Sequence, residues 1–296
     1  MKPAVVTGAS GFLGRALATR LKADGREVIA LLRDGSDDSK LRGIEVMRHD
    51  GTTGDLRRLL EKAGAETVFH LAAFVAGDAR PEEDLEPLIR SNVLFGAQLA
   101  EACARTGAFK LVSAGTYYER RGGAGYDPVS LYAATKRAMN DLLEYYARAT
   151  KVRAASLVLY DTYGPGDERP KLLNLLAQHA ASGEPLKLSP GEQRLDLLHA
   201  DDACSAFLAA EKALSSSSEL GVHEWCASSG ERVTLRQLVS LFEEATGLKV
   251  PAELGGKPYR EREVMHPYQG PQVPGWKAEI PLKEGLRRVY GAKARA

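Results

Sequence analysis

Two side chains near the middle of the chain could carry out acid–base chemistry together. Tyr132 and Lys136 stand four residues apart in the run Tyr-Ala-Ala-Thr-Lys, inside a helical pattern over residues 131–149, so they should share one face of a helix. A free tyrosine has a pKa of about 10, and a neighbouring cation favours the phenolate. We therefore expect Lys136 to lower the pKa of Tyr132, which would make the phenol a proton donor or acceptor near neutral pH.

Three glycines near the start of the chain form a phosphate-binding pattern. The run Thr-Gly-Ala-Ser-Gly-Phe-Leu-Gly over residues 7–14 follows a short apolar segment and precedes leucines at helical spacing. Gly8 and Gly11 allow a tight turn and the close approach of a diphosphate, and Gly14 allows the helix to pack on the strand. This context predicts a dinucleotide site contacted by Gly8, Ser10, Gly11, Phe12, Leu13 and Gly14.

The end of the second predicted strand bears on the choice between NAD and NADP. A carboxylate there would bind the ribose hydroxyls, whereas an arginine accommodates a 2′-phosphate. The strand ends in Arg33, which favours NADP(H) over NAD, although Asp34 beside it leaves NAD open. Asp50, which closes the third predicted strand and precedes Gly51, is expected to meet the adenine amino group.

Short apolar runs alternate with helical patterns over the first half of the chain. Strands are predicted at 4–6, 28–32, 45–47, 67–71, 110–113 and 155–160, with helices at 56–63, 85–105 and 131–149. This alternation predicts an α/β, Rossmann-like doubly wound parallel sheet that binds ligands beyond the carboxyl ends of its strands.

The regularity fades after residue 165, which predicts two lobes. We expect residues 1–165 to form an NADP-binding domain, to which some later segments return, and residues 166–296 to form mainly a smaller substrate-binding lobe. Helices are predicted at 171–183, 202–214 and 235–246. Six prolines between Pro251 and Pro281 predict a loop-rich segment.

Composition excludes several classes of protein. The 40 basic and 39 acidic residues argue against nucleic acid as a partner, because such proteins carry a basic excess. Three dispersed cysteines without a CxxC pair, and six scattered histidines, predict no metal site. The chain shows no signal-peptide pattern and no apolar run of about 20 residues, the length of a membrane span. We therefore expect a reduced cytoplasmic protein without membrane contact.

Four motifs resemble the extended short-chain dehydrogenase/reductase family, which contains the NAD-dependent epimerases, dehydratases and reductases of nucleotide sugars. In chain order they are the glycine run, Phe-His-Leu-Ala-Ala at 69–73, Ser-Asn-Val at 91–93 and Tyr-Ala-Ala-Thr-Lys at 132–136. Segments 126–136, 161–165 and 188–193 are most similar to the abequose-synthase-like reductases. Those enzymes reduce the 4-keto group of nucleotide-linked 4-keto-6-deoxyhexoses.

The resemblance assigns roles to further residues. It implies that Tyr132 and Lys136 are catalytic and that the cofactor is also contacted by Leu71, Ala72, Ala73, Asn92, Tyr132, Lys136, Tyr160 and Thr162. The family places a hydroxyl at the end of the strand before the catalytic helix. We favour Thr116 for that role and keep Ser113 as the second candidate, since alignment on Tyr118 would put Ala114 there, which has no hydroxyl.

The resemblance also implies a substrate and a reaction. A nucleotide-diphosphate sugar would be held by Ser113, Thr116, Asp161, Arg169, Lys171 and Arg194, with Arg260 more distant. Arginine suits the diphosphate because its planar fork makes paired hydrogen bonds. Family dehydratases carry an Asp-Glu pair after their Thr, where this chain has Tyr117 and Tyr118, so dehydration is not expected.

The leading hypothesis is therefore an NADPH-dependent 4-ketoreductase of deoxysugar biosynthesis. An NAD-dependent nucleotide-sugar 4-epimerase is the alternative, although such epimerases usually carry an acidic residue after the second strand. A non-catalytic NADP-sensing protein is a third possibility, which would need neither Tyr132 nor Lys136. Family members commonly form homodimers through the two long helices, here 85–105 and 131–149.

Overall fold

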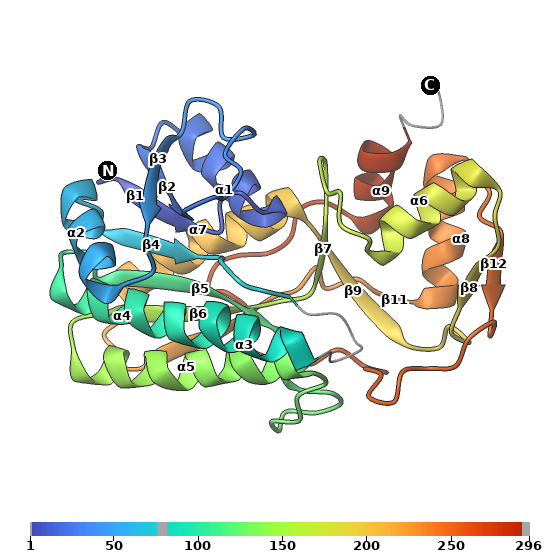
Figure 1. Cartoon of the computed structure of the whole chain (residues 1–296). Coiled ribbons are helices and arrows are strands. Elements are labelled where there is room, and N and C mark those ends of the chain that lie inside the picture. The colour runs from blue at the N-terminus through green and yellow to red at the C-terminus, as the bar shows by residue number, and fades with distance from the viewer. Residues whose placement is uncertain (1, 76–81, 292–296) are drawn as a thin grey trace.

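A seven-stranded parallel sheet forms the centre of the larger of two lobes (Figure 1). The computed structural model describes residues 2–75 and 82–291. The strand order is β10-β6-β5-β4-β1-β2-β3. The strands are β1 (Ala4–Thr7), β2 (Val28–Arg33), β3 (Glu45–His49), β4 (Thr67–His70), β5 (Lys110–Thr116), β6 (Arg153–Leu159) and β10 (Val222–Ala227). The expected α/β doubly wound sheet is thus confirmed.

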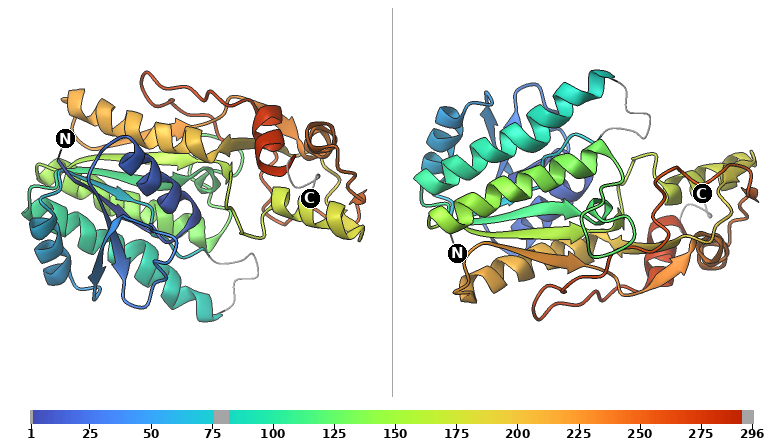
Figure 2. Two further views of the ribbon diagram at one scale, coloured as in Figure 1. Left: turned by 90° about the horizontal axis from the view of Figure 1, so that it is seen from above. Right: turned by 90° about the horizontal axis from the view of Figure 1, so that it is seen from below.

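Helices cover both faces of this sheet (Figure 2). On one face lie α1 (Phe12–Ala23) and α7 (Ala200–Ser216), which share an apolar core with the sheet. The other face is covered by α2 (Thr53–Ala63), α4 (Phe95–Arg105) and α5 (Leu131–Ala149). Because both faces are covered, the inner strands are apolar and buried along nearly their whole length.

The direction of winding reverses between β1 and β4. From β1 the chain continues to β2 and β3 on one side, then crosses to β4, β5 and β6 on the other. Thr7, the last residue of β1, is in register with both Leu31 of β2 and His70 of β4. Ligands of doubly wound folds bind beyond the carboxyl ends of the strands at such a reversal.

The helix expected over residues 85–105 is interrupted by a π-helical turn. It consists of α3 (Leu85–Leu88), the π-helical segment η2 (Ile89–Leu94) and α4. A short 3-10 segment, η1 (Glu82–Asp84), precedes it. The extra residue in a π turn redirects side chains and is often found at functional sites, and here the turn contains Asn92.

The smaller lobe has its own core and two short sheets. One sheet has the order β11-β9-β7 and the other pairs β12 with β8. Three helices pack on them around a separate apolar cluster. The elements are β7 (Asp161–Tyr163), β8 (Leu186–Leu188), β9 (Arg194–His199), β11 (Arg232–Thr234), β12 (Ala252–Leu254), α6 (Leu172–Ser182), α8 (Leu235–Thr246) and α9 (Leu282–Tyr290).

Two elements from later in the chain, α7 and β10, belong to the larger lobe, and Val273 and Trp276 pack against its core. The expected helices at 171–183, 202–214 and 235–246 correspond to α6, α7 and α8. Between the prolines at 251 and 281, the described chain forms little regular structure beyond β12, as expected.

Candidate active site

The glycine turn after β1 lies directly against the segment that follows β4. Gly8 has a φ of +69°, and a Cβ atom on it would lie 2.5 Å from the backbone nitrogen of Ala72. The Oγ1 atom of Thr7 accepts a hydrogen bond from that same nitrogen (3.2 Å) and is also hydrogen-bonded to Nδ1 of His70 (2.8 Å). Only glycine can occupy position 8, because any side chain would both strain the backbone and fill the turn.

The start of α1 is suited to a diphosphate. Gly11 is its N-cap, and within the described residues no side chain caps the helix and no acidic residue lies in its first turn. The first N–H groups and the positive end of the helix dipole therefore remain available to an anion. Gly14 lies against the carbonyl oxygen of Gly8, as expected for close helix–strand packing. Ser10 is exposed at the rim of the turn, and Phe12 and Leu13 begin the helix.

The carboxyl ends of β2 and β3 lie at the same edge of the sheet as the glycine turn. Arg33 is the exposed last residue of β2. Arg48 of β3 donates to the Ser36 carbonyl (3.1 Å) and to the Asp38 carboxylate (2.6 Å), which fixes the loop after Arg33. Sequence reasoning did not single out Arg48. Asp50 accepts from the N–H of Thr52 (2.8 Å), a hydrogen bond that lowers the pKa of its carboxyl group, and Gly51 turns the chain toward α2.

Hydrogen bonds of Asn92 link α5, which carries Tyr132 and Lys136, to the segment that follows β4. Its Nδ2 donates to the carbonyl of Phe74 (2.9 Å) and to Oγ1 of Thr135 (3.0 Å), and its Oδ1 accepts from the N–H of Phe74 (2.7 Å). Leu71, Ala72 and Ala73 lie in this extended segment beside the glycine turn. Asn92 is expected to contact the cofactor. Within the protein, its hydrogen bonds hold the start of α5 next to the segment that follows β4.

Tyr132 and Lys136 lie on successive turns at the start of α5. Ser130 caps that helix by accepting from the N–H of Ala133 (3.3 Å). Burial lowers the pKa of Lys136 to about 8, and the charge of Glu119 opposes that shift. The positive charge of Lys136 also helps to lower the pKa of His70 at the end of β4, where burial is the main cause. The pair therefore lies at the carboxyl edge of the sheet.

The pKa of Tyr132 differs from the sequence-based expectation. Burial and, to a lesser extent, the charge of Glu119 raise the pKa of this phenol to about 12, and the charge of Arg169 opposes the shift. The expectation that Lys136 lowers the pKa of Tyr132 is wrong for this structure. Burial destabilises the phenolate more than the nearby cations stabilise it. In this state Tyr132 is a protonated phenol at neutral pH and can act as a proton donor.

The two candidate hydroxyls occupy different places on β5. Thr116 is the buried last residue of the strand, and its Oγ1 accepts from the N–H of Tyr118 (3.3 Å) at the start of the 3-10 turn η3 (Tyr117–Glu119). The Thr116 hydroxyl can therefore still donate. Ser113 lies three residues earlier within the sheet, where its hydroxyl donates to the carbonyl of Ala155 (3.3 Å).

A cluster of tyrosine side chains lies beside Asp161. The sequence analysis mentioned two of them, Tyr117 and Tyr118, only because they replace the Asp-Glu pair of the family dehydratases. Tyr117 donates to the Asp161 carboxylate (3.1 Å), and its ring is stacked on Tyr160 with centroids 5.2 Å apart. The Tyr118 ring lies 4.3 Å from that of Tyr117. Tyr160, expected to contact the cofactor, is buried, and its hydroxyl donates to the carbonyl of Tyr268 (2.5 Å).

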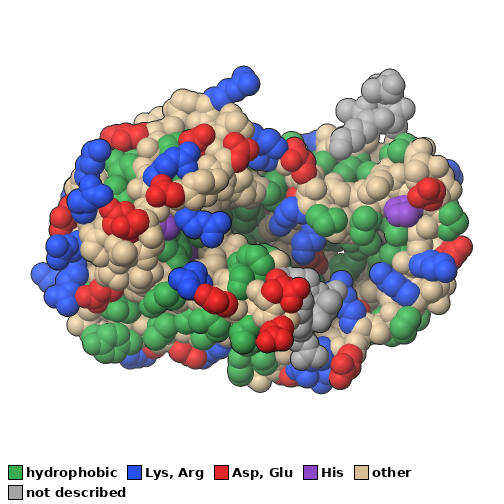
Figure 3. All heavy atoms as spheres, in the orientation of Figure 1, with side chains coloured by type: hydrophobic (Ala, Val, Ile, Leu, Met, Phe, Trp, Pro, Cys, Tyr) green, Lys and Arg blue, Asp and Glu red, His purple; other side chains and the backbone are tan. Residues whose placement is uncertain are grey.

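Cations from the smaller lobe converge on Asp161. Burial raises the pKa of its carboxyl group, while the charges of Lys171, Arg169 and Arg260 oppose that shift. Lys171 immediately precedes α6. Figure 3 shows Lys and Arg side chains in the hollow between the two lobes. Arg194, by contrast, is exposed at the start of β9.

Arg169 connects the two sides of the cleft. It donates to Asp167 (2.7 Å) and to the carbonyl of Thr162 (2.9 Å), and its guanidinium group lies 4.6 Å from the centre of the Phe12 ring. Phe12 belongs to the glycine turn and Thr162 to β7. Arg169 therefore lies between the glycine turn and the smaller lobe.

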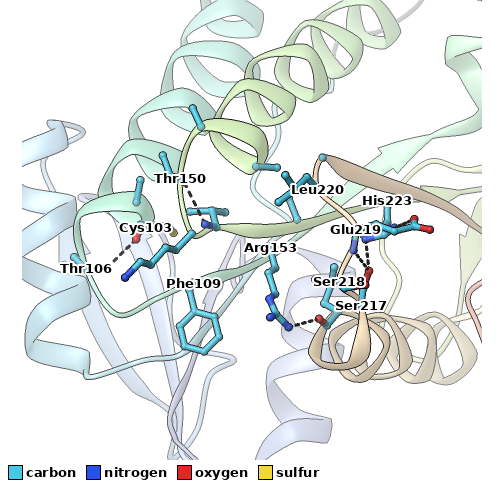
Figure 4. Close-up of a pocket in the computed structure, with 18 of the residues that line it drawn as sticks. Cys103, Thr106, Phe109, Thr150, Arg153, Ser217, Ser218, Glu219, Leu220 and His223 are labelled. Atoms are coloured by element: carbon cyan, nitrogen blue, oxygen red, sulfur yellow. Dashed lines mark hydrogen bonds and ion pairs between the residues drawn. The ribbon is translucent and has the colours of Figure 1, made fainter.

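A second depression lies at the opposite, amino-terminal edge of the sheet (Figure 4). It is lined by Thr106 and Phe109 before β5, by Arg153 at the start of β6, and by residues 217–221 before β10. Arg153 donates there to the carbonyl of Leu214 (3.1 Å). Because parallel sheets bind ligands at the carboxyl edge, this depression is separate from the candidate site.

The described residues contain no group of three or more His, Cys, Asp or Glu side chains that could hold a metal ion. The same part of the chain includes no helix with the length and apolarity of a membrane span.

A glycine turn of this kind, with a Tyr–Lys pair on the helix after β5, defines a short-chain dehydrogenase/reductase fold. Residues 4–220 match the NAD dependent epimerase/dehydratase family, and the chain belongs to that family, whose members are NAD(P)-dependent sugar-nucleotide enzymes.

Relatives of known activity cover nearly the whole chain. A CDP-abequose synthase of Yersinia pseudotuberculosis is 27% identical over 89% of this chain and 90% of its own length. A UDP-glucose 4-epimerase of Mycolicibacterium smegmatis is 26% identical over 96% of each chain. The solved structure of MoeE5 in complex with UDP-glucuronic acid and NAD is 27% identical, with a TM-score of 0.83 and 99% of both chains covered. The resemblance to abequose synthases expected from the sequence is confirmed.

Proposed function

We propose that this protein reduces the C4 keto group of a nucleotide-linked 4-keto-6-deoxyhexose with NADPH, a reaction of deoxysugar biosynthesis. The observation that carries the proposal is the half-buried, protonated Tyr132, one helical turn from Lys136 at the carboxyl edge of the sheet. A ketone becomes an alcohol only if its oxygen receives a proton, and a protonated phenol supplies one.

The chain's own residues divide the work as follows. Tyr132 donates its proton to the carbonyl oxygen, Thr116 hydrogen-bonds that oxygen, and Lys136 holds the nicotinamide ribose. The turn at Gly8 and the open start of α1 bind the diphosphate of the dinucleotide. When bound, the reduced nicotinamide supplies the hydride.

The choice of NADPH rests on Arg33. This arginine is exposed at the tip of β2, where a 2′-phosphate on the adenine ribose would lie. Arg48 steadies the loop beside it through Ser36 and Asp38. The solved relative MoeE5 was captured with NAD, and titration of this protein with NADPH and with NADH tests the choice.

The substrate class rests on the cations that border Asp161. Arg169, Lys171 and Arg260 act together on that carboxylate, and a sugar nucleotide brings a diphosphate that suits such a group of cations. The abequose synthase relative supports a CDP- or otherwise nucleotide-linked deoxysugar, and MoeE5 supports a nucleotide-diphosphate sugar in general.

One assay separates this proposal from its alternatives. Purified protein is mixed with NADPH and a panel of nucleotide-linked 4-keto-6-deoxyhexoses, and the loss of NADPH absorbance and the C4 configuration of the product are followed. We expect NADPH to be consumed and a single 4-hydroxy epimer to form. If no NADPH is consumed but a 4-hydroxy sugar is interconverted with its C4 epimer, the protein is a 4-epimerase, the activity of the mycobacterial relative. NADPH binding without either reaction would support a sensing role.

We also propose that the protein forms a homodimer through α4 and α5. The helical segment that leads into α4 exposes Leu85, Ile89 and Leu94, and α5 exposes Leu142 and Tyr145. These helices lie side by side, and exposed apolar patches on adjacent helices often mark protein interfaces. Light scattering should give twice the chain mass, and Leu142→Glu should reduce it to that of one chain.

A further inference from the structure

Glu119 is a buried carboxylate that the proposed reaction does not use. It ends η3, the turn after β5, and its side chain is 1% exposed. Its carbonyl oxygen accepts from the N–H of Asp127 (3.0 Å), which holds the turn in place. The backbone of Thr116 favours the ionised form of the Glu119 side chain, but among the described residues neither carboxylate oxygen has a partner with full hydrogen-bond geometry. A buried carboxylate with so little hydrogen bonding is costly to ionise.

The charges around Glu119 come from three elements. Helix α5 packs against η3 and brings Tyr132 and Lys136, the turn itself brings Arg120, and β10 brings Glu224. Arg120 donates to Glu224 (2.5 Å), and its guanidinium group lies 4.4 Å from the centre of the Tyr268 ring. Two cations therefore act on Glu119: Arg120, which follows the turn, and Lys136 on the catalytic helix.

From this arrangement we propose that Glu119 is a positioning residue whose negative charge holds the Tyr132–Lys136 pair in its proton-donating form, a neutral phenol and an ammonium group. The proposal rests on the proposed function, because it assigns Tyr132 the role of acid. A carboxylate beside the pair disfavours a second negative charge on the phenol and favours the positive charge on the lysine.

The electrostatics of the site agree with this role. Glu119 opposes the effect of burial on the pKa of Lys136, and it adds to the effect of burial on the pKa of Tyr132. Burial raises the pKa of Glu119 itself to about 7, with Glu224 acting in the same direction and Arg120 and Lys136 opposing. Above that pH Glu119 carries the negative charge that acts on the pair.

The proposed role of Glu119 predicts how the rates of ketone reduction and of alcohol oxidation depend on pH. Reduction needs the protonated phenol, so its rate falls as the pH rises through the pKa of Tyr132. Oxidation of the product alcohol needs the phenolate, so its rate rises through the same pKa. Removing the charge of Glu119 lowers that pKa, and both limbs must then move to lower pH by the same amount.

The test compares wild type with Glu119→Gln and Glu119→Asp. In Glu119→Gln, the pH at which kcat/KM for ketone reduction begins to fall should be about one unit lower than in wild type. The pH at which kcat/KM for alcohol oxidation begins to rise should be lower by the same amount. Glu119→Asp keeps the charge and should shift less. Glu66→Gln is the matched control, because Glu66 pairs with Lys110 (2.7 Å) near the amino ends of the strands, and its limbs should not move.

A purely structural role would give a different result. Glu119→Gln would then lower kcat equally at every pH and leave both limbs in place, which would overturn the proposal. If Glu119→Gln does not fold, Glu119→Leu, which also removes the charge, takes its place. Unshifted limbs in that variant would likewise overturn the proposal.

A measurement without turnover separates this proposal from the proposed function. In protein labelled with ¹³C at the tyrosine ζ carbon, the Tyr132 signal can be assigned with Tyr132→Phe and titrated by NMR. If no keto sugar is reduced, the proposed function fails, yet a lower Tyr132 pKa in Glu119→Gln would still support the electrostatic role. An unchanged Tyr132 pKa would refute that role whatever the activity.

Discussion

The two sides of the cleft are built in different ways. The proposed cofactor side, residues 7–14 and 71–73, is formed mostly by backbone, since the Gly8 turn lies against Ala72 and leaves N–H groups of α1 open. The proposed substrate side is formed by the side chains of Tyr117, Asp161, Arg169 and Lys171, which come from segments far apart in the chain. A site made of backbone depends on short local sequence, whereas a site made of side chains depends on how distant segments pack.

Tyr132, which lies between the two sides, should show the largest effect. Tyr132→Phe removes the proton donor but keeps the ring, so turnover should fall by about 10²–10⁴-fold, the usual contribution of a general acid. Affinity for NADPH, measured by fluorescence titration, should stay at the wild-type level because the glycine turn is unchanged. A variant that keeps half of the wild-type turnover would remove Tyr132 from the mechanism.

On the cofactor side, one side chain should matter for selectivity. Arg33→Ala should weaken NADPH binding by roughly 1.5–3 kcal/mol, or about 10- to 150-fold, because a charge-assisted contact to phosphate is lost. NADH binding should be nearly unaffected. Arg20→Ala, which removes an exposed partner of Asp24 at the end of α1, serves as the control for a general loss of positive charge. Equal losses for the two cofactors would contradict the assignment of Arg33.

The hydroxyl at the end of β5 should have a smaller effect. Thr116→Val should lower turnover by about 5- to 10-fold, the value of one hydrogen bond of about 1 kcal/mol, with little change in NADPH affinity. Ser113→Ala should be milder, because the Ser113 hydroxyl is already bonded to Ala155 within the sheet. The reverse order of effects would transfer the role to Ser113.

The smallest expected effect concerns stability on the substrate side. Burial raises the pKa of Asp161 above its ordinary value of 3.8, so the folded state binds this proton more tightly than the unfolded state. The resulting stabilisation is present below about pH 4 and is lost as the pH rises through the folded-state pKa. Asp161→Asn should remove that loss, so its free energy of unfolding in urea should fall less than that of wild type between pH 4 and pH 8. Parallel pH profiles for the two proteins would show that Asp161 is not the group responsible.

The regular part of the fold could be read from the chain. Six strands of the large sheet and the helices around it follow from apolar runs and helical spacing, because their patterns are local. Strand β10 was not predicted, since Val222–Ala227 alternates His, Glu and Trp without a clear apolar run, and pairing with β6 decides its structure. Three-residue strands such as β8 and β12 were also missed, because so few residues carry no periodicity.

Local sequence patterns predicted the glycine turn, the Tyr132–Lys136 pair and the parallel sheet that brings them to one edge. These features depend on residues close together in the chain, and they were sufficient to indicate the family. The protonation of the site could not be predicted in this way, because a pKa depends on burial and on charges that the fold brings from distant segments. Tyr132 is thus a protonated phenol rather than the readily ionised one that its spacing from Lys136 suggested, and Glu119, unremarkable in the sequence, lies buried beside both.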